Sequence, residues 1–397
     1  MPKNAVNLII FDVIASFGSQ IFSFACSFFI LKHTDNTAFF SIYLAVVTLS
    51  TIISAPLFGT FTDTMNNKRL ITAAQIVNIV SLVLFVFIYH SFFYYILILG
   101  IILNLTDGAI SNIISANIQQ IAEDSIERFI SLFQSIGKGI SIIAPILGGV
   151  LITFVSIEKL ALFNVLTELS AIVIIYFIPL KATLSRNEQN FWFDFKEGFH
   201  YLLSKRFILS VIIFMTVFNF LANCIAVGMP IISIQSLKLS APQFGFVESS
   251  FTFAMMLMMI VLSIFPIKQA LKGSMQISLS IMALTIIGLG LYLLNIQSNT
   301  FSFIVILTVM TLVGISLPIF NVPTMIFMQK VIDDQFKGRV FGLCNSISQS
   351  MTPLSFVFFG MVLNNQQGWV FLITGRDFLL TILLFSLVIK KDQFNVV

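Results

Sequence analysis

The chain has 397 residues, of which 58% are hydrophobic and 10% are charged, and its mean hydropathy is +1.01. A soluble domain is about a quarter charged, so this composition excludes a cytosolic enzyme, a nucleic-acid-binding protein and a disordered chain, although it leaves a membrane enzyme open. Cys26, Cys224 and Cys344 lie far apart within apolar stretches. Their spacing offers neither a disulfide framework nor a metal-ligand set, and we expect no metal and no cofactor.

Apolar stretches long enough to cross a membrane recur along the whole sequence. A spanning helix needs about 20 apolar residues, because the hydrocarbon core is about 30 Å thick and each helical residue rises about 1.5 Å. Twelve stretches meet this length, at residues 6–31, 38–58, 70–89, 92–117, 129–155, 161–180, 207–235, 243–265, 275–294, 301–329, 340–363 and 368–389. The sequence therefore predicts an all-α polytopic membrane protein with twelve transmembrane helices.

One long polar break divides these stretches into two sets of six. We expect an N-terminal six-helix bundle over residues 1–180, a cytoplasmic linker over 181–206 and a C-terminal six-helix bundle over 207–397. The first apolar stretch is too long for a signal-peptide core and has no small-residue cleavage site before Lys32. It is therefore expected to remain as the first helix.

The distribution of Lys and Arg predicts the orientation in the membrane. With both termini in the cytoplasm, sixteen Lys and Arg residues fall in cytoplasmic loops, and only Lys32, Lys159 and Lys238 fall outside. Basic residues are enriched in cytoplasmic loops of membrane proteins. We therefore expect a multi-pass protein of the cell membrane with both termini cytoplasmic, whose net charge of +4 expresses this bias.

An internal repeat supports the division into halves. Residues 119–128 read Gln-Gln-Ile-Ala-Glu-Asp-Ser-Ile-Glu-Arg, and residues 329–339 read Gln-Lys-Val-Ile-Asp-Asp-Gln-Phe-Lys-Gly-Arg. Both segments follow the fourth apolar stretch of a half. Equal topological positions indicate parallel repeats related by an axis along the membrane normal.

A motif with a known counterpart lies between the second and third stretches. Residues Gly59 to Arg69 read Gly-Thr-Phe-Thr-Asp-Thr-Met-Asn-Asn-Lys-Arg. They resemble the G-x-x-x-D-[RK]-x-x-[RK]-[RK] loop of the major facilitator superfamily, with Gly59, Asp63, Lys68 and Arg69 kept and Thr64 in place of a basic residue. The resemblance implies that Gly59 permits close helix approach and that Asp63 faces the positive end of a neighbouring helix as a gate. An ordinary positively charged cytoplasmic loop is the alternative.

The fifth stretch carries a second element of this kind. Gly139 is followed by Ala144-Pro145-Ile-Leu-Gly148-Gly149. This segment resembles the G-P-x-x-G-G element of the proton-antiporter branches of the superfamily, with Ala144 in place of the first glycine. A proline kinks a helix, and small residues let another helix pack over the bend. The alternative is a packing face that has no bearing on the direction of transport.

Two further segments narrow the resemblance. Residues 196–203 and 336–343 are similar to the branch that holds macrolide-efflux proteins and enterobactin exporters. Many drug–proton antiporters of the superfamily carry an arginine in the fourth helix, whereas the polar residues here are Asn104, Thr106 and Asp107. The proton-relay residues of the family are therefore not carried over to this sequence.

Seven ionisable residues fall within the apolar stretches, at a cost of roughly 2.5–3.5 kcal/mol each. The acids are Asp12, Asp107, Glu168, Glu248 and Asp377, and the bases are Lys138 and Arg376. The surplus of acids favours reversible protonation or a cationic substrate, so all seven are candidates for proton coupling or substrate binding. For Asp12 and Glu248 the alternative is contact with interfacial water, and for Glu168 it is a carboxylate satisfied by neighbouring amides and hydroxyls.

Two of these charges are expected to pair. Asp107 and Lys138 each lie some ten residues from the same short hairpin, so both should stand at a similar depth and form a structural or gating ion pair. Arg376 and Asp377 are consecutive and point about 100° apart on a helix. We therefore expect each of them to need its own partner or to face a cavity.

The sequence also holds 45 phenylalanines. They suit an aromatic cavity that binds amphipathic cations or macrocycles by shape. They equally suit packing against lipid.

Together these features predict a secondary active efflux transporter and not an enzyme. No G-x-x-x-x-G-K-[ST] loop is present, so ATP drive is not expected. We expect export of a small amphipathic compound, drug-like or macrolide-like, in exchange for protons, by a monomer in the lipid bilayer that binds no nucleic acid. The alternatives are export of an endogenous metabolite or siderophore and a non-transporting membrane protein, although His33, His90 and His200 lie in separate loops and form no catalytic cluster.

Neutralising Asp63 tests the gating role that the resemblance implies. Asp63→Asn should leave expression unchanged and lower transport by about tenfold, because a charge–dipole contact worth about 0.5–2 kcal/mol is lost in one conformational state only. Transport assays at matched membrane expression measure this effect. Full transport by the variant would exclude the gate.

Overall fold

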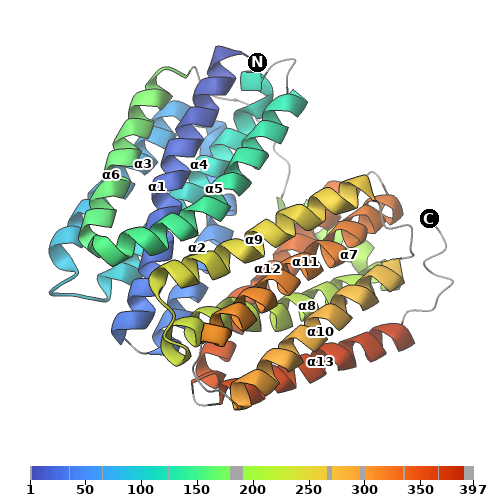
Figure 1. Ribbon diagram of the computed structural model, residues 1–397. Coiled ribbons are helices and arrows are strands. Elements are labelled where there is room, and N and C mark those ends of the chain that lie inside the picture. Colours follow the sequence, from blue (N-terminus) through green and yellow to red (C-terminus); the bar gives the residue numbers. More distant parts are fainter. Residues whose placement is uncertain are drawn as a thin grey trace. The chain divides into compact units, whose positions relative to one another are not determined.

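The computed structural model is helical throughout the part of the chain that it describes (Figure 1). The described residues are 2–34, 36–64, 66–122, 126–178, 191–265, 271–295, 300–333, 336–364 and 366–388. Within these ranges the chain forms thirteen α-helices, one π-helical turn and no strand. The predicted all-α fold is confirmed.

The first compact unit contains six helices. It comprises Met1–Asp35, Ile42–Asn187 and Ser240–Ser249 and is called unit 1. Its helices are α1 (Lys3–Thr34), α2 (Thr37–Thr64), α3 (Asn67–Ile88), α4 (Tyr95–Ala122), α5 (Ile126–Phe154) and α6 (Ile157–Tyr176). The start of α9 also belongs to this unit, where the Ser249 hydroxyl donates to the carbonyl of Ile142 at 2.6 Å.

The second compact unit, unit 2, comprises Asn36–Ser41, Glu188–Leu239 and Ser250–Val397. Its helices are α7 (Phe191–Ser204), α8 (Arg206–Ile231), the π-helical turn η2 (Ile232–Ser236), α9 (Ala241–Ile264), α10 (Leu271–Leu294), α11 (Thr300–Val331), α12 (Lys337–Val362) and α13 (Gln367–Val388). The start of α2 belongs to this unit, where the Thr37 hydroxyl donates to the carbonyl of Gly360 at 3.1 Å.

The same helix pairs pack in both units, which supports the internal repeat. In unit 1, α1 packs against α5 and α6, and α3 packs against α4 and α6. In unit 2, α8 packs against α12 and α13, and α10 packs against α11 and α13. If α8 to α13 are taken as the counterparts of α1 to α6, these four pairs are identical. The starts of the second helices, α2 and α9, also bond to equivalent partners, α12 and α5.

Eleven helices in the described ranges are long and apolar enough to cross a membrane. The predicted span at residues 340–363 corresponds to α12, which does not meet this criterion. The first half of α12 is rich in short polar side chains, namely Asn345, Ser346, Ser348, Gln349 and Ser350. Of these residues, Ser348 is buried, whereas Ser346, Gln349 and Ser350 are exposed.

Two segments that were predicted as loops are helical. The α2 helix continues to Thr64, so Gly59 and Asp63 lie on its last two turns and not in a loop between helices. The second half of the predicted linker forms α7, whose residues Phe191–Ser204 include several aromatic and aliphatic side chains. The polar break in the sequence therefore contains an amphipathic helix. Its charged residues made the segment look like a loop.

The α7 helix is fixed to the connection between α11 and α12. The Tyr201 hydroxyl donates to Oδ2 of Asp333 at 3.1 Å and accepts the Asp333 backbone N–H at 3.2 Å. The Tyr201 ring stacks on Phe336 with 4.4 Å between centroids. The second copy of the repeated segment, residues 329–339, therefore anchors the helix that enters unit 2.

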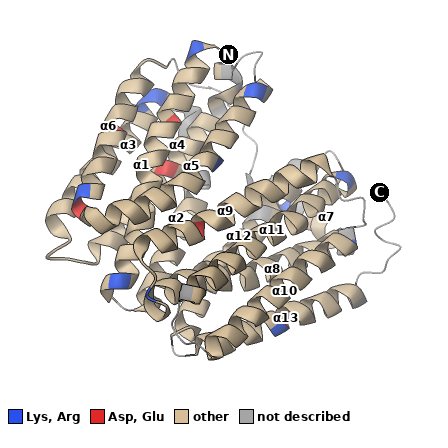
Figure 2. Ribbon diagram, viewed as in Figure 1, with Lys and Arg blue, Asp and Glu red and all other residues tan. Residues whose placement is uncertain are grey.

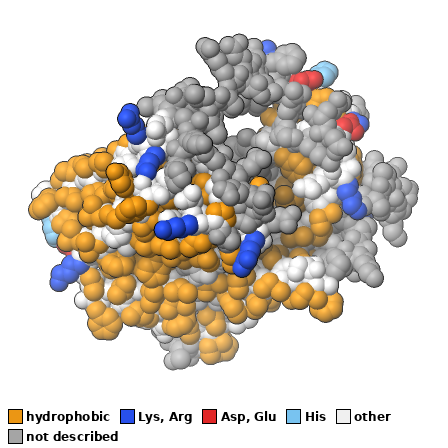
Figure 3. Space-filling model, turned by 90° about the horizontal axis from the view of Figure 1, so that it is seen from above, with side chains coloured by type: hydrophobic (Ala, Val, Ile, Leu, Met, Phe, Trp, Pro, Cys, Tyr) orange, Lys and Arg blue, Asp and Glu red, His pale blue; other side chains and the backbone are white. Residues whose placement is uncertain are grey.

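The surface of the described helices is apolar, as expected for contact with lipid. Large side chains such as Phe87, Leu166 and Leu284 are exposed by 76%, 62% and 67%. Hydrophobic side chains cover most of the described surface on the face shown in Figure 3, with Lys and Arg side chains standing among them. Charged residues are sparse along the helices (Figure 2). A soluble protein rarely exposes contiguous apolar surface on this scale.

The glycines of α5 differ in how closely they are approached. A Cβ atom on Gly149 would clash with the backbone of Ala241, whereas a Cβ atom on Gly139 would meet nothing within 4 Å. Gly245 is likewise packed against the backbone of Pro145. The second half of α5 and the start of α9 therefore approach each other through glycines that leave no room for a side chain.

This difference predicts opposite effects for two matched substitutions. Gly149→Ala should lower the melting temperature of the purified protein in detergent by several degrees, because forcing a methyl group into a packed contact costs about 1–3 kcal/mol. Gly139→Ala, on the same helix, should leave the melting temperature unchanged or raise it, since Ala is the better helix former. Equal melting temperatures for the two variants would show that this contact does not stabilise the fold.

Candidate functional site

Four helices of unit 1 direct polar side chains into its interior. On α3, Gln75, Asn78 and Ser81 follow one another at three-residue spacing and are at most 5% exposed. Residues spaced in this way share one face of a helix. The α4 and α6 helices, which both pack against α3, contribute Asp107 and Glu168 to the same region.

Asp107 is held by donors from two neighbouring helices. The Ser19 hydroxyl on α1 donates to Oδ2 of Asp107 at 2.9 Å, and the amide nitrogen of Asn78 on α3 donates to Oδ1 at 3.3 Å. The Thr106 hydroxyl contacts the carbonyl oxygen of Asn78. Both carboxylate oxygens of Asp107 are thus hydrogen-bonded, which favours its charged form.

Glu168 shares the same amide but is less well satisfied. The Asn78 nitrogen lies 3.5 Å from Oε1 of Glu168, and Oε2 has no hydrogen-bond partner in the described part of the chain although the residue is only 2% exposed. Gln75, one turn before Asn78, is fully buried beside Glu168, and neither of its amide atoms has a partner at good hydrogen-bond geometry among the described residues. A buried polar atom without a partner costs about 1–3 kcal/mol, so such atoms mark a place where a ligand, a water molecule or a proton belongs.

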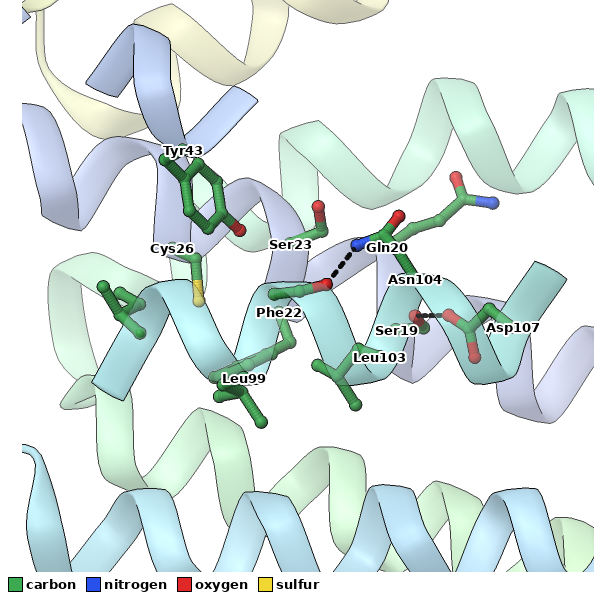
Figure 4. Close-up of a pocket in the computed structure, with 12 residues that line it drawn as sticks. Ser19, Gln20, Phe22, Ser23, Cys26, Tyr43, Leu99, Leu103, Asn104 and Asp107 are labelled. Atoms are coloured by element: carbon green, nitrogen blue, oxygen red, sulfur yellow. Dashed lines mark hydrogen bonds between the residues drawn. The ribbon is translucent and has the colours of Figure 1, made fainter. Parts of the chain in front are cut away.

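Asp107 lies at one end of a first cavity, shown in Figure 4. This space of about 200 Å³ lies between α1, α2 and α4 and is called the Tyr43 cavity. Its lining residues are Ser19, Gln20, Phe22, Ser23, Cys26, Tyr43, Ile96, Leu99, Gly100, Leu103, Asn104 and Asp107. Ser19, Gln20, Asn104 and Asp107 gather at one end, and Cys26 and Tyr43 lie at the other (Figure 4). The cavity therefore combines a polar end with apolar walls.

A second cavity, of about 240 Å³, brings three predicted acids together. It is called the Asp12 cavity and is lined by Phe11, Asp12, Ala15, Ser16, Ser19, Gln20, Asp107, Ile110, Ser111, Ile114, Ser115, Phe133 and Glu168. Asp12 accepts a hydrogen bond from Ser16 at 3.4 Å. The described residues that line this cavity include no Lys, Arg or His. The two cavities share Ser19, Gln20 and Asp107, so Asp107 borders both.

The predicted ion pair between Asp107 and Lys138 is wrong. Asp107 takes its hydrogen bonds from Ser19 and Asn78, and no ion pair joins it to Lys138, although the structure describes both side chains. Lys138 is exposed and lines neither cavity. The prediction rested on the equal depth of the two residues in the membrane. Depth does not say which face of α5 carries Lys138.

Arg376 and Asp377 also differ from expectation. The guanidinium of Arg376 donates to Oδ1 of Asp377 from Nε at 3.1 Å and from Nη2 at 2.8 Å. The side chains are exposed by 64% and 36% on α13. The expectation that each residue needs its own partner or a cavity is wrong, because the long arginine side chain reaches the neighbouring carboxylate along the helix surface.

The remaining candidates lie elsewhere. The Lys68 ammonium donates to the carbonyl of Tyr176 and lies 5.0 Å from the centre of its ring, while Arg69 is exposed at the start of α3. The structure describes the backbone of Gly59 and Asp63 on α2, and the side chain of Asp63 and the surroundings of Gly59 lie outside the described part. Glu248 is half-buried near the start of α9 and lines neither cavity.

In the helix-five element, Pro145 lies inside the continuous helix α5. A Cβ atom on Gly148 would lie 3.0 Å from the ring of Phe24 on α1. The small residues of this element therefore serve close packing in unit 1, against α1 at Gly148 and against the start of α9 at Gly149.

Few phenylalanines reach the two cavities. Phe22 lines the Tyr43 cavity, and Phe11 and Phe133 line the Asp12 cavity. Others form packed pairs, such as Phe218 and Phe320, whose rings stack 3.9 Å apart in unit 2. Neither cavity is enclosed mainly by aromatic rings.

Sequence reasoning missed the neutral partners of the acids, namely Ser19, Gln75, Asn78 and Thr106. Burying an amide or a hydroxyl in an apolar helix costs less free energy than burying a charge, so these residues do not stand out in the sequence. The regular spacing of Gln75, Asn78 and Ser81 on one face of an apolar stretch was the signal that could have identified α3 as part of the site.

The fold and the buried polar site define a polytopic α-helical membrane protein built from two repeated helix bundles. Residues 8–356 match the Major Facilitator Superfamily, and the chain belongs to this family. No curated protein matches the sequence.

Solved structures share the fold at low sequence identity. The nucleoside transporter NupG is 13% identical with a TM-score of 0.77, over 97% of this chain and 98% of that one. A bacterial homologue of the iron transporter ferroportin, in an inward-facing state, is 15% identical with a TM-score of 0.70, over 96% and 98%. A D-xylose–proton symporter is 13% identical with a TM-score of 0.69, over 96% and 97%. These likenesses show the fold of a transporter and leave its substrate open.

The arrangement around Asp107 predicts independent effects for two charge removals. Asp107→Asn should lower transport by about 10- to 100-fold, because hydrogen bonds to a charged group contribute about 1.5–3 kcal/mol. Lys138→Gln should change transport by no more than about twofold, as for other surface substitutions. In the double variant the two effects should add within about 0.3–0.5 kcal/mol, as measured by transport rates. A larger interaction energy would show that Asp107 and Lys138 interact directly.

Proposed function

We propose that the protein exports a small amphipathic compound across the cell membrane in exchange for protons. The chain belongs to a transporter family, and its fold is that of solved transporters for several unrelated substrates. The proposal therefore depends on the chemistry of the cavities in unit 1.

The acidic lining of the Asp12 cavity carries the proposal of proton coupling. Asp12, Asp107 and Glu168 share this cavity, and no base stands among the lining residues that the structure describes. Ionised carboxylates in a poorly solvated space repel one another and lose hydration energy, so reversible protonation is the natural way to neutralise them. Within the described residues no three His, Cys, Asp or Glu side chains are placed to hold a metal ion. Protons therefore fit the site better than a directly bound metal.

The Tyr43 cavity supports an amphipathic substrate. Its volume of about 200 Å³ is below the roughly 300–1,000 Å³ of pockets that enclose drug-sized ligands. It suits the polar head group of a larger compound, since Asp107, Asn104 and Gln20 stand at one end and apolar residues form the walls. A head group with a positive charge or hydrogen-bond donors complements Asp107.

The export direction is supported by resemblance. The Pro145, Gly148 and Gly149 element resembles the proton-antiporter branches, and the distribution of Lys and Arg favours cytoplasmic termini in the cell membrane. Export of an anionic metabolite or siderophore is the weaker alternative, because the acids of the two cavities would repel an anion.

The direct test is transport in cells and vesicles. Collapsing the proton gradient with an ionophore at constant ATP should stop export of a fluorescent amphipathic cation such as ethidium, and inverted vesicles should lose lumenal acid when it is added. The matched control is the Asp107→Asn variant, which should show neither response at equal expression.

Two outcomes would contradict the proposal. Export that survives the ionophore would remove the proton gradient as the energy source. Export that follows an imposed sodium gradient would assign the coupling to another ion. A panel of anionic, neutral and cationic compounds in strains that lack or overproduce the protein would test the preference for cations.

A further inference from the structure

We propose that the two carboxylates joined by Asn78 have separate tasks: Glu168 carries the exchanged proton, and Asp107 stays ionised and holds the head group of the substrate. The inference rests on the proposed proton antiport and assigns its parts to particular side chains. It also makes Asn78 a positioning residue that links the two.

Asp107 is held by more short hydrogen bonds than Glu168. Its two oxygens accept hydrogen bonds from Ser19 at 2.9 Å and from Asn78 at 3.3 Å, so the ionised form is stabilised from two helices. Asp107 is also the only one of the three acids that borders both cavities. It can therefore face a cationic head group in the Tyr43 cavity without first losing a proton.

Glu168 has the opposite surroundings. Its Oε2 atom has no hydrogen-bond partner among the described residues, and the side chain is 2% exposed. Its other oxygen has only the long contact of 3.5 Å with Asn78. It lines the Asp12 cavity and not the Tyr43 cavity. A proton on Oε2 removes the uncompensated charge of this buried carboxylate.

Asn78 connects the two acids through one amide group. Its nitrogen lies within hydrogen-bond distance of Oδ1 of Asp107 and at the limit of that distance from Oε1 of Glu168. Ionised carboxylates only accept hydrogen bonds, so the amide nitrogen and not the oxygen must face them. The nitrogen carries two N–H groups, so it can donate to both carboxylates at once and hold them near each other. Two ionised carboxylates at this distance repel each other, so a proton on Glu168 favours the charge on Asp107 that binds the substrate.

The other groups around the cavity do not supply a countercharge. The α1 helix contributes Asp12, the α4 helix contributes Asp107, and the α6 helix contributes Glu168. The α5 helix contributes Phe133, while the α3 helix provides the amides of Gln75 and Asn78 beside Glu168. Three acids with no base among the described lining residues make an added proton favourable, and Glu168 is the one of the three that is buried.

The proton step is a simple exchange with water of the Asp12 cavity. An O–H bond forms at Oε2 of Glu168 when a hydronium ion gives up its proton. The same bond breaks on release to water, and its electron pair stays on the carboxylate oxygen. No other co-reactant is needed.

Infrared spectroscopy of the purified, ligand-free protein tests the assignment without a known substrate. The wild type should show the C=O band of a protonated carboxylic acid near neutral pH, which disappears as the pH is raised. Glu168→Gln should abolish this titrating band, whereas Asp107→Asn and Asp12→Asn should retain it. Asn78→Leu should move its midpoint by about one pH unit to higher pH, because a donor to the ionised pair is lost.

The outcomes separate this inference from the proposed function. A band that titrates but is abolished by Asp107→Asn and retained in Glu168→Gln would overturn the division of tasks and leave proton coupling intact. The complete absence of a titrating band in the wild type would contradict both. Glu168→Gln and Asp107→Asn change the shape of the side chain very little, so these two variants can still be compared if Asn78→Leu fails to fold. If Asn78→Leu folds and its midpoint is unshifted, Asn78 does not link the two acids.

Discussion

A polar atom buried inside a helical bundle must find its partner on a neighbouring helix, because lipid offers none. In unit 1 this requirement joins α1, α3, α4 and α6 through a single group of side chains. Asp107 on α4 takes donors from Ser19 on α1 and Asn78 on α3, and Asn78 also reaches Glu168 on α6. The network fixes the faces that the helices turn to one another, and it gives Asp107 shorter hydrogen bonds than Glu168.

Close packing makes this arrangement possible. A Cβ atom on Gly18 of α1 would clash with the side chain of Thr167 on α6 and would lie 2.8 Å from the amide oxygen of Asn164. The absence of a side chain at this position lets α1 and α6 approach, which brings Glu168 towards the residue that follows Gly18, Ser19. Small residues at helix crossings thus place the polar site, as they commonly do in membrane bundles.

The two units share their packing pairs but not their chemistry. The acids of the Asp12 cavity all belong to unit 1, whereas in the described part of α13, the counterpart of α6, Arg376 and Asp377 neutralise each other at the surface. The two units therefore have the same helix packing but different buried charges. This difference is consistent with a transporter in which one half carries the coupling site. Function therefore has to be argued from the side chains of unit 1 and not from the fold.

The sequence predicted the fold well because hydropathy and length are nearly sufficient for spanning helices. It also identified Asp107 and Glu168 as deep acids and placed Asp12 among the candidates, and the structure brings these three to one cavity. What it could not supply was the rotation of each helix about its axis. Lys138 stands at a suitable depth but on an exposed face of α5, while the neutral Asn78 turned out to be the partner.

The central claim is that the acids of the Asp12 cavity bind protons reversibly near neutral pH. Potentiometric titration of the purified wild type against a variant carrying Asp12→Asn, Asp107→Asn and Glu168→Gln tests it most directly. Ordinary carboxyls titrate near pH 4, so between about pH 8.5 and 5.5 they take up few protons. The account predicts that the wild type takes up about one proton more than the variant over this range. Equal uptake by the two proteins would contradict it.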